Sequence, residues 1–333
     1  MKTNNLQWLL REGVIVMEII EIRSEFLKDV VELAECMYSM ECKYVAELKR
    51  ERKEELHKWI EEAIDNQQGV VCIVQGKVVG YMLFTIYSNE DSICWCMVPV
   101  WGYGAIEKAR EKILSKMFQN VADILCRKQK VHFEIKVYAH DEEAIRLFTL
   151  LQFGIQCEEE IRNTEVCILV KTDVSIRELD KNEIENRWSE VWKLIFGLIE
   201  HLRKSPIFYP GTEFTEELYR DYFMDIETHV FIAEKENRII GLMDANREGN
   251  SFITNDESCF SVSDIFVIEE YRGNWIAREL LSYVNDTLRD KGIRRLWVEH
   301  GTANPNARGF WNKYFSTFSY TLVRDIDYFS LLR

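Results

Sequence analysis

The chain contains one internal repeat, and this repeat constrains the fold more than any other feature of the sequence. A short apolar segment begins each copy, at residues 19–23 and 174–177. Alternating apolar runs joined by turn residues follow, which predicts a β-hairpin at 70–86 and another at 230–244. A chain that repeats such a unit repeats a whole supersecondary plan, so we expect the fold of one half to recur in the other.

The second part of each copy repeats as well. A strand ending at Val98 or Val267 leads through a Gly-containing turn into an amphipathic helix. A further strand and a short helix beginning at Asp141 or Asn304 come next, and a final strand is expected at 165–170 or 320–325. We therefore predict two homologous α/β domains, at residues 17–171 and 172–333. Residues 1–16 are interpreted as an N-terminal extension.

Composition narrows the class of protein. Of the 333 residues, 47% are hydrophobic and only 4 are Pro, which is typical of packed domains and excludes a disordered chain. The formal net charge of -14 disfavours nucleic acid and anionic membrane surfaces as partners and favours small cationic molecules. No apolar run has transmembrane length, and the first sixteen residues lack the features of a signal peptide, so we expect a cytoplasmic protein.

Several residues that often bind metals have more ordinary interpretations here. The nine cysteines lack zinc-site spacing, and we expect reduced thiols, with Cys94 and Cys96 packed on one face of a strand. His300 has no metal-ligand partner in the sequence, and the glutamates at 158–160 are typical of a solvated face. No metal site is therefore predicted.

The turn of the second copy carries the candidate chemistry. The strand at 263–267 leads through Tyr271, Arg272 and Gly273 into a helix N-terminus. Such an end presents backbone N–H groups and the positive end of the helix dipole, so it is a ready anion site, suited to a phosphate-bearing cofactor. In the first copy we match this turn to residues 98–105, which include Gly102 and Gly104.

In these features both copies resemble the GNAT superfamily of N-acetyltransferases, over residues 19–170 and 174–325. That family has a strand ending in Val, a turn of the form R-G-x-G-x-G/A, and a later N-x-x-A-x-x-x-Y helix. The resemblance implies two tandem GNAT-type α/β (α+β) domains, each a mixed, mostly antiparallel twisted sheet flanked by helices, with acetyl-CoA as co-substrate. It also implies that the cofactor contacts Phe266, Val267, Arg272, Gly273, Asn274, Trp275, Ile276, Ala277 and Asn304.

The two copies depart from the family pattern in different ways. Trp275 stands at the middle Gly of the second turn, whereas the first copy has Trp101 in place of the Arg and Asp141 in place of the Asn. By the resemblance, the general base lies three residues before the terminal Val of the strand. That position is Asp264 in the second copy and Trp95 in the first, so we place catalysis in the second domain.

The usual acid of the family is missing from both copies. Trp311 and Phe148 occupy the position of its Tyr, and Tyr314, one helical turn further on, is the nearest substitute for Trp311. An aromatic side chain at helical spacing more often packs than reacts, so a packing role for Tyr314 stays open beside the catalytic one.

The predicted function is acetyl-CoA-dependent transfer of an acetyl group to a primary amine of a small, cationic molecule. The alternative is a non-catalytic acyl-CoA-binding or regulatory tandem GNAT-fold protein. Residues 204–212, which hold two of the four prolines, are either the acceptor-binding loop or an ordinary helix connection. The acceptor's identity and the oligomeric state do not follow from the sequence.

Overall fold

The computed structural model describes residues 16–49, 52–66, 68–88, 94–204, 206–208 and 214–333, so most of the predicted extension at 1–16 lies outside the described residues. The chain divides into two compact units. The first consists of Met1–Glu158 together with Phe318–Arg333, and the second of Glu159–Thr317. In the described part of the chain, no helix combines the length and apolar character needed to cross a bilayer.

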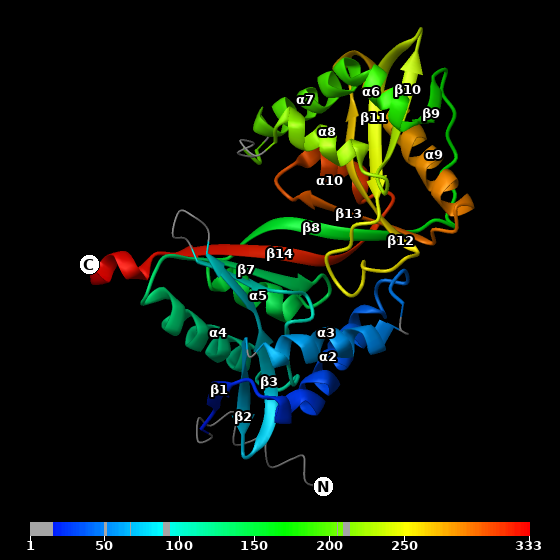
Figure 1. The fold of residues 1–333 in the computed structure, drawn as a ribbon. Coiled ribbons are helices and arrows are strands. Elements are labelled where there is room, and N and C mark those ends of the chain that lie inside the picture. Colours follow the sequence, from blue (N-terminus) through cyan, green and yellow to red (C-terminus); the bar gives the residue numbers. More distant parts are fainter. Residues whose placement is uncertain (1–15, 50–51, 67, 89–93, 205, 209–213) are drawn as a thin grey trace. The chain divides into compact units, whose positions relative to one another are not determined.

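The first unit contains four α-helices and two sets of paired strands among its described residues (Figure 1). One set has the order β1-β2-β3-β6, and the other the order β4-β5-β7-β14. The elements are β1 (Glu18–Glu21), η1 (Ser24–Phe26), α2 (Leu27–Glu41), α3 (Lys53–Asp65), β2 (Gly69–Val74), β3 (Lys77–Leu83), β4 (Thr85–Ser88), β5 (Cys94–Val98), β6 (Tyr103–Ala105), α4 (Arg110–Cys126), β7 (Val131–Tyr138), α5 (Glu142–Leu150), β14 (Ser316–Ile326) and η4 (Tyr328–Leu332).

The second unit contains one sheet with helices on both faces (Figure 1). Its strands follow the order β8-β13-β12-β11-β10-β9, with β12 parallel to β13 and antiparallel to β11. The elements are β8 (Gly154–Asn163, shared with the first unit), β9 (Ser175–Leu179), α6 (Lys181–Asn186), α7 (Trp188–Lys204), α8 (Glu216–Met224), β10 (His229–Lys235), β11 (Arg238–Asn246), β12 (Cys259–Val267), η3 (Glu269–Tyr271), α9 (Ile276–Asp290), β13 (Arg295–Gly301) and α10 (Pro305–Trp311).

The predicted repeat is visible in the strand pairing. Gly80 of β3 lies opposite Ala105, and Gly241 of β11 lies opposite Val267. A helix crosses each glycine closely: a Cβ added at Gly80 would lie 2.6 Å from Ile113 Cγ2 of α4, and one at Gly241 would lie 3.3 Å from Leu280 Cδ1 of α9. Both glycines therefore have the same role, which is to let the helix after the turn pack on the hairpin.

The second unit has an apolar core on each face of its sheet. Leu280 and Val284 of α9 are fully buried in one core, and Ile195 of α7 and Phe223 of α8 are fully buried in the other. Because β12 lies between these cores, its last residues are held firmly from both sides. This position matters for the turn that follows the strand.

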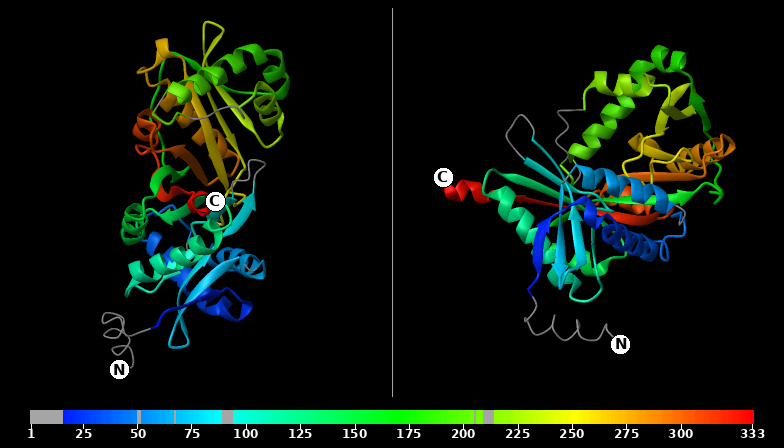
Figure 2. Two further views of the ribbon diagram at one scale, coloured as in Figure 1. Left: turned by 90° about the vertical axis from the view of Figure 1, so that its left-hand side faces the viewer. Right: turned by 60° about the horizontal axis from the view of Figure 1, so that its bottom comes forward.

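The last strand of the chain completes the sheet of the first unit. β14 pairs with β7 in antiparallel register, from Ser319 opposite Tyr138 to Ile326 opposite Val131 (Figures 1 and 2). His132 Nδ1 of β7 lies 2.8 Å from Asp325 Oδ1 of β14. The end of the first copy, from Glu159 onward, belongs to the second unit instead. The compact units thus divide the chain at positions other than the expected boundary at 171 and 172.

The strand expected at 165–170 was wrong. The last strand of the first copy is β8, at Gly154–Asn163, and the residues after it are irregular. Thr164 N–H donates to Arg294 O (3.0 Å), and Ser282 Oγ donates to Ile168 O (2.6 Å). Because side chains and loop backbone satisfy these groups, the segment forms no strand although residues 166–170 are all apolar.

The pairing of β14 with β7 predicts where a core substitution in β14 acts. Leu322 is fully buried opposite Ile135, so Leu322→Ala should cost about 2–5 kcal/mol of stability in the first unit. Amide hydrogen exchange should accelerate in β7, while β10 and β11 keep their protection. Leu331→Ala, at a residue 77% exposed, is the control and should change neither. Faster exchange confined to the second unit would contradict this assignment of β14.

Candidate functional site

The turn between β12 and α9 has the geometry of an anion site. Trp275 is the N-cap of α9 with φ 64°, and no side chain caps this end, so the first N–H groups of the helix lack intrahelical acceptors. Gly273 has φ 79°, and a Cβ built there would meet no atom within 4 Å. Ile276 is 3% exposed and fixes the helix start in the core. The turn is therefore rigid at its base and open on its outer side, as the phosphates of a cofactor require.

Arg272 ties this turn to the end of β12. Its Nε donates to Val267 O at 2.8 Å, and its guanidinium lies 5.1 Å from the centre of the Phe266 ring. Arg272 is thus positioned at the turn, as predicted. The carbonyl of Val267, which the resemblance assigns to the cofactor, is engaged by Arg272.

Most of the other residues predicted to bind the cofactor lie in the same turn or in the first turn of α9. Trp275 is 63% exposed, with the Arg278 guanidinium 5.5 Å from its ring, so its indole leaves the turn open. Asn274 Nδ2 lies 3.4 Å from Tyr271 O, and Ala277 packs against the core. Asn304 caps α10, where its Oδ1 accepts N–H groups of the first helical turn, and its amide nitrogen is not used in that cap.

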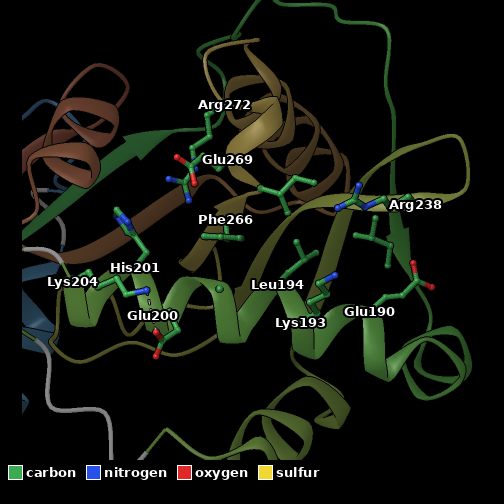
Figure 3. Close-up of a pocket in the computed structure, with 13 residues that line it drawn as sticks. Glu190, Lys193, Leu194, Glu200, His201, Lys204, Arg238, Phe266, Glu269 and Arg272 are labelled. Carbon is green, nitrogen blue, oxygen red and sulfur yellow. Dashed lines mark ion pairs between the residues drawn. The ribbon is translucent and has the colours of Figure 1, made fainter.

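A pocket of about 560 Å³ lies beside this turn within the second unit (Figure 3). Helix α7 forms one wall, and Phe266 and Arg272 lie across from it (Figure 3). Four cations contribute to its lining: Lys193, Lys204, Arg238 and Arg272. They outnumber its three carboxylates, and this balance favours an anionic ligand.

Gly197 and His201 of α7 shape that pocket. A Cβ at Gly197 would lie 2.8 Å from Phe266 Cζ, so glycine is what lets the ring lie against the helix. Burial lowers the pKa of His201, and the positive charge of Arg272 lowers it further. His201 therefore favours its neutral form in the pocket.

Asp264 lies two residues before Phe266 on β12. Burial raises its pKa to about 6, and a hydrogen bond from Tyr219 opposes this rise. Its backbone N–H donates to Asp244 Oδ1 at 2.9 Å. A carboxylate with a pKa near 6 is suited to general-base work at neutral pH.

Asp244, which the sequence analysis missed, is the partner of Asp264. It is fully buried on β11, and Tyr222 OH donates to its Oδ2 at 2.6 Å. Burial raises the pKa of Asp244 well above its usual value, and the nearby charge of Asp264 raises it further. Two adjacent carboxylates do not readily ionise together, so the pair favours sharing one proton. The sequence signal was a carboxylate inside the apolar run at 239–245.

A second pocket, of about 520 Å³, has Asp264 in its lining. Glu248 and Glu299 also line it, together with Trp297, whose Nε1 donates to Glu248 O at 2.9 Å. The charged residues of its lining are all carboxylates. This pocket favours a cationic ligand, with the indole face as a further attraction.

The first unit has neither part of this arrangement, and its turn was predicted at the wrong residues. Residues 102–105 end a strand: β6 pairs with β3 so that Ala105 matches Val267. Only residues 106–109 separate this strand end from α4, whereas 268–275 separate Val267 from α9. The loop that would hold phosphates is therefore four residues shorter in the first unit.

The same register corrects the positions matched to the catalytic residues. Counting back from Ala105, Gly102 corresponds to Asp264, rather than Trp95. Leu83 corresponds to Asp244. Trp101 is buried, with its ring 6.0 Å from that of Trp59, and does not belong to the turn. The sequence match had aligned Val98 with Val267, seven residues before Ala105, the residue that the register aligns with it.

Tyr314, proposed as the acid, packs in the core of the second unit. Its ring centre lies 5.3 Å from that of Phe310, and it lines neither pocket described above. The geometry therefore supports packing, and the acid role is left as a prediction. Cys94 and Cys96 are fully buried, as expected of packed thiols.

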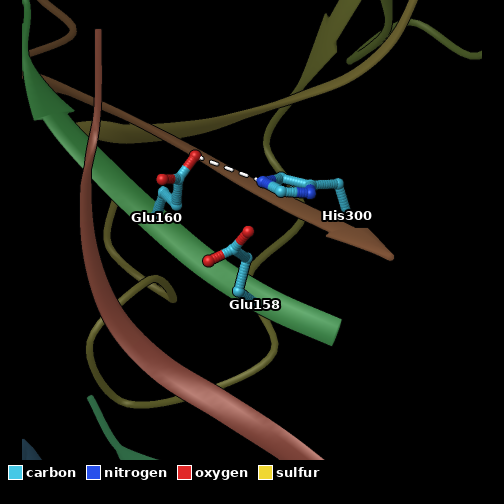
Figure 4. Close-up of side chains that lie close together, drawn as sticks. All are labelled: Glu158, Glu160 and His300. Atoms are coloured by element: carbon cyan, nitrogen blue, oxygen red, sulfur yellow. Dashed lines mark hydrogen bonds and ion pairs between the residues drawn. The ribbon is translucent and has the colours of Figure 1, made fainter. Parts of the chain in front are cut away.

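The solvated face expected for residues 158–160 was wrong, because all three glutamates are buried on β8. Within the second unit, Glu160 accepts a hydrogen bond from Asn312 Nδ2 (2.6 Å) and pairs with His300 at 3.3 Å (Figure 4). Glu159 accepts from Asn250 Nδ2 at 2.5 Å. These partners offset the cost of burying the carboxylates, and they give His300 a structural contact.

The predicted acceptor loop at 204–212 is described only in part. Residues 205 and 209–213 lie outside the described residues, and Phe208 is 75% exposed. The acceptor-binding loop and the helix connection both stay predictions for this segment.

Comparison with known proteins supports the resemblance to GNAT proteins. Residues 196–316 match the model of the acetyltransferase (GNAT) family. A GCN5-related N-acetyltransferase from Sphaerobacter thermophilus has 11% sequence identity and a TM-score of 0.55, over 93% of this chain and 95% of that chain. A GCN5-related glucosamine N-acetyltransferase region of a fungal multi-domain GH3 β-N-acetylglucosaminidase has 12% identity and a TM-score of 0.53, over 94% of this chain and 38% of that chain. No curated protein matches the chain in sequence. The predicted fold class is confirmed.

The raised pKa values of the Asp pair predict how stability depends on pH. The folded state binds protons more tightly than the unfolded chain, so stability falls as pH rises from about 4, where an unfolded Asp titrates, through about 6. Asp264→Asn removes this loss and should gain about 1–2 kcal/mol relative to wild type between about pH 4 and pH 7. Urea unfolding across this range measures the difference. The exposed Asp221→Asn is the control, and a difference for Asp264→Asn that does not rise with pH would contradict the prediction.

Proposed function

Starting from a chain that matches the GNAT acetyltransferase family over residues 196–316 and has a GNAT fold along nearly its whole length, we propose that it is an acetyl-CoA-dependent N-acetyltransferase. The proposed acceptor is a primary amine of a small cationic molecule. The second unit is the proposed site of the reaction.

One observation carries this proposal: strand β12 connects an uncapped helix end with a carboxylate whose pKa is raised. Its last residues lead into the uncapped end of α9, with Arg272 and the cationic pocket beside it. Asp264, on the same strand, lines the acidic pocket. An anionic cofactor and a cationic acceptor thus have separate, electrostatically suited places next to one carboxylate.

The residues of the turn fit the cofactor. Gly273 leaves room for phosphates, the N–H groups at the start of α9 have no side-chain cap, and Arg272 supplies a positive charge. When bound, acetyl-CoA supplies the activated acetyl thioester. Asn304, with its amide nitrogen, is the further proposed contact from α10.

Asp264 is the proposed general base. It would take one proton from the acceptor ammonium, and the amine nitrogen would then bond to the acetyl carbon as the C–S bond breaks and the thiolate leaves. The second proton that the nitrogen loses would pass to solvent water. Asp244 acts through Asp264 as a positioning residue, since its Oδ1 accepts the Asp264 N–H, and the charge of Asp264 in turn raises the pKa of Asp244. The thiolate would be protonated by water or by a group that we do not assign.

The alternative function, a non-catalytic acyl-CoA-binding or regulatory protein, rests on a specific observation. Trp311, at the position of the family's acid, is 2% exposed and packs against Phe315, so it donates no proton to a leaving group. Both functions include binding of acetyl-CoA, and turnover separates them.

Turnover tests the proposed base. Wild type should release free thiol from acetyl-CoA in the presence of some member of a panel of polyamines, aminoglycosides and amino acids. The rate should rise with pH through about 6, where Asp264 ionises. Asp264→Asn should lower kcat at least about 100-fold and leave acetyl-CoA binding nearly intact. The exposed Asp221→Asn is the matched control. An unchanged rate would remove Asp264 from the mechanism, and no turnover with any amine would favour the alternative.

Cofactor binding tests the turn. Arg272→Ala should weaken acetyl-CoA binding about tenfold or more, because it removes a charge from the phosphate site. Calorimetric titration with acetyl-CoA measures the Kd. The control is Arg220→Ala, whose guanidinium pairs with Glu185 on the same unit away from the turn. Equal affinities of Arg272→Ala and wild type would place the cofactor elsewhere.

A further inference from the structure

The first unit contains a cavity that the proposed reaction does not use. It has a volume of about 910 Å³, larger than either pocket of the second unit described above. Helix α2, the start of β3, the short turn at 106–109 and the start of α5 line it. Pockets for organic ligands commonly have volumes of about 300–1,000 Å³, so the cavity is large enough for a small molecule.

The walls of this cavity are mainly apolar. Leu33, Met37 and Met40 contribute from α2, and Val79 and Ile106 lie across from them. Met40 is 39% exposed, so part of the apolar wall is open to solvent. Methionine side chains adapt to ligands of different shape, which suits a pocket for an apolar body.

The base of the cavity excludes the cofactor binding proposed for the second unit. Arg110 forms an ion pair with Asp141, and their side chains are 7% and 8% exposed. Arg110 also donates to Ala105 O at 2.9 Å, and Tyr103 OH donates to Asp141 at 2.9 Å. Asp141 thus neutralises the charge of Arg110, and the guanidinium is bound to protein groups. The turn at 106–109 is too short to hold phosphates.

The entrance of the cavity favours a positive charge. The Tyr44 ring is 64% exposed and stacks on His140, with ring centres 4.5 Å apart and an interplanar angle of 3°. Glu41 pairs with His140 Nδ1 at 2.8 Å and is 2% exposed. Glu142 and Glu143 add carboxylates from α5. An aromatic face beside carboxylates is a suitable place for an ammonium group.

The overall charge of the lining agrees with this. Five carboxylates line the cavity, against three Lys and Arg side chains, one of which is Arg110. With Arg110 committed to Asp141, the remaining charges still favour a cation.

We propose that this cavity binds a small amphipathic amine, with its apolar body against Leu33, Met37 and Met40 and its ammonium group at Tyr44 and the carboxylates of the entrance. The first unit is then a ligand-binding domain with a specificity of its own. The site is independent of the acetyl-CoA turn of the second unit.

Binding of phenylbutylamine to the full chain tests the proposal, with phenylbutanol and phenylbutyrate as neutral and anionic analogues. Titration calorimetry should show saturable binding of the amine and at least about tenfold weaker binding of both analogues. Met40→Trp fills the cavity from its exposed side and should weaken amine binding about tenfold or more. Met224→Trp, at a methionine 37% exposed on the second unit, is the matched control and should bind as wild type.

Two further measurements test the ammonium position and the integrity of the second unit. Tyr44→Ala, at a residue already 64% exposed, should weaken binding of the amine more than binding of phenylbutanol. Acetyl-CoA affinity should be unchanged in Met40→Trp, which shows that the second unit is intact. Amine binding that neither Met40→Trp nor Tyr44→Ala alters, equal binding of the three probes, or no saturable binding would overturn the proposal. None of these results bears on turnover or on the Arg272 site, so failure here is distinct from failure of the proposed function.

Discussion

The structure depends on backbone pairing between segments that lie far apart in the sequence. β7 would be an edge strand without β14, and the register from Ser319 to Ile326 satisfies its N–H and C=O groups with the last strand of the chain. The residues after Glu158 contribute to the second unit in turn, with Thr164 bonded to Arg294 and Ile168 in the core. Each unit is therefore incomplete without residues from the other copy of the repeat. The two copies share one folding requirement although their sites have diverged.

That divergence arises from small changes along one strand and its turn. In both copies the helix packs closely on the hairpin at a glycine, Gly80 or Gly241. The loop that follows the strand is four residues longer in the second copy than in the first. This length decides whether the loop before the helix N-terminus has room for phosphates. One residue pair on the strands decides the acid–base chemistry, since Asp244 and Asp264 correspond to Leu83 and Gly102. Close packing at the two glycines preserves the fold in both copies. The acid–base chemistry depends on Asp244 and Asp264, which this packing does not require.

The sequence predicted what depends on local pattern. The hairpins, the helix after each turn and the glycines follow from periodicity and turn chemistry, and the structure contains them. The anion site at Gly273 stays a prediction. The sequence did not predict to which unit β14 and the end of β8 belong. Each copy of the repeat offers an equivalent position for these strands, and tertiary contacts decide which one they take. The exposure of Glu160 was predicted wrongly for the same reason. A run of glutamates is normally exposed to solvent, but here Asn312 and His300, which are distant in the sequence, bind the Glu160 carboxylate. Asp244 was missed because its partner is supplied by strand register.

The net charge of -14 is distributed in a way that resolves an apparent conflict. An acidic chain repels an anionic cofactor at long range, but salt screens that repulsion beyond about 10 Å, so local groups decide binding. In the second unit the cations gather beside the turn, and the carboxylates gather around Asp264. In the first unit the only buried cation at the corresponding place, among the described residues, is Arg110, and Asp141 neutralises it. Arg272 thus supplies a positive charge at the turn of the second unit, whereas in the first unit the charge of Arg110 is neutralised by Asp141. The cavity of the first unit therefore accommodates an apolar ligand better than a phosphate.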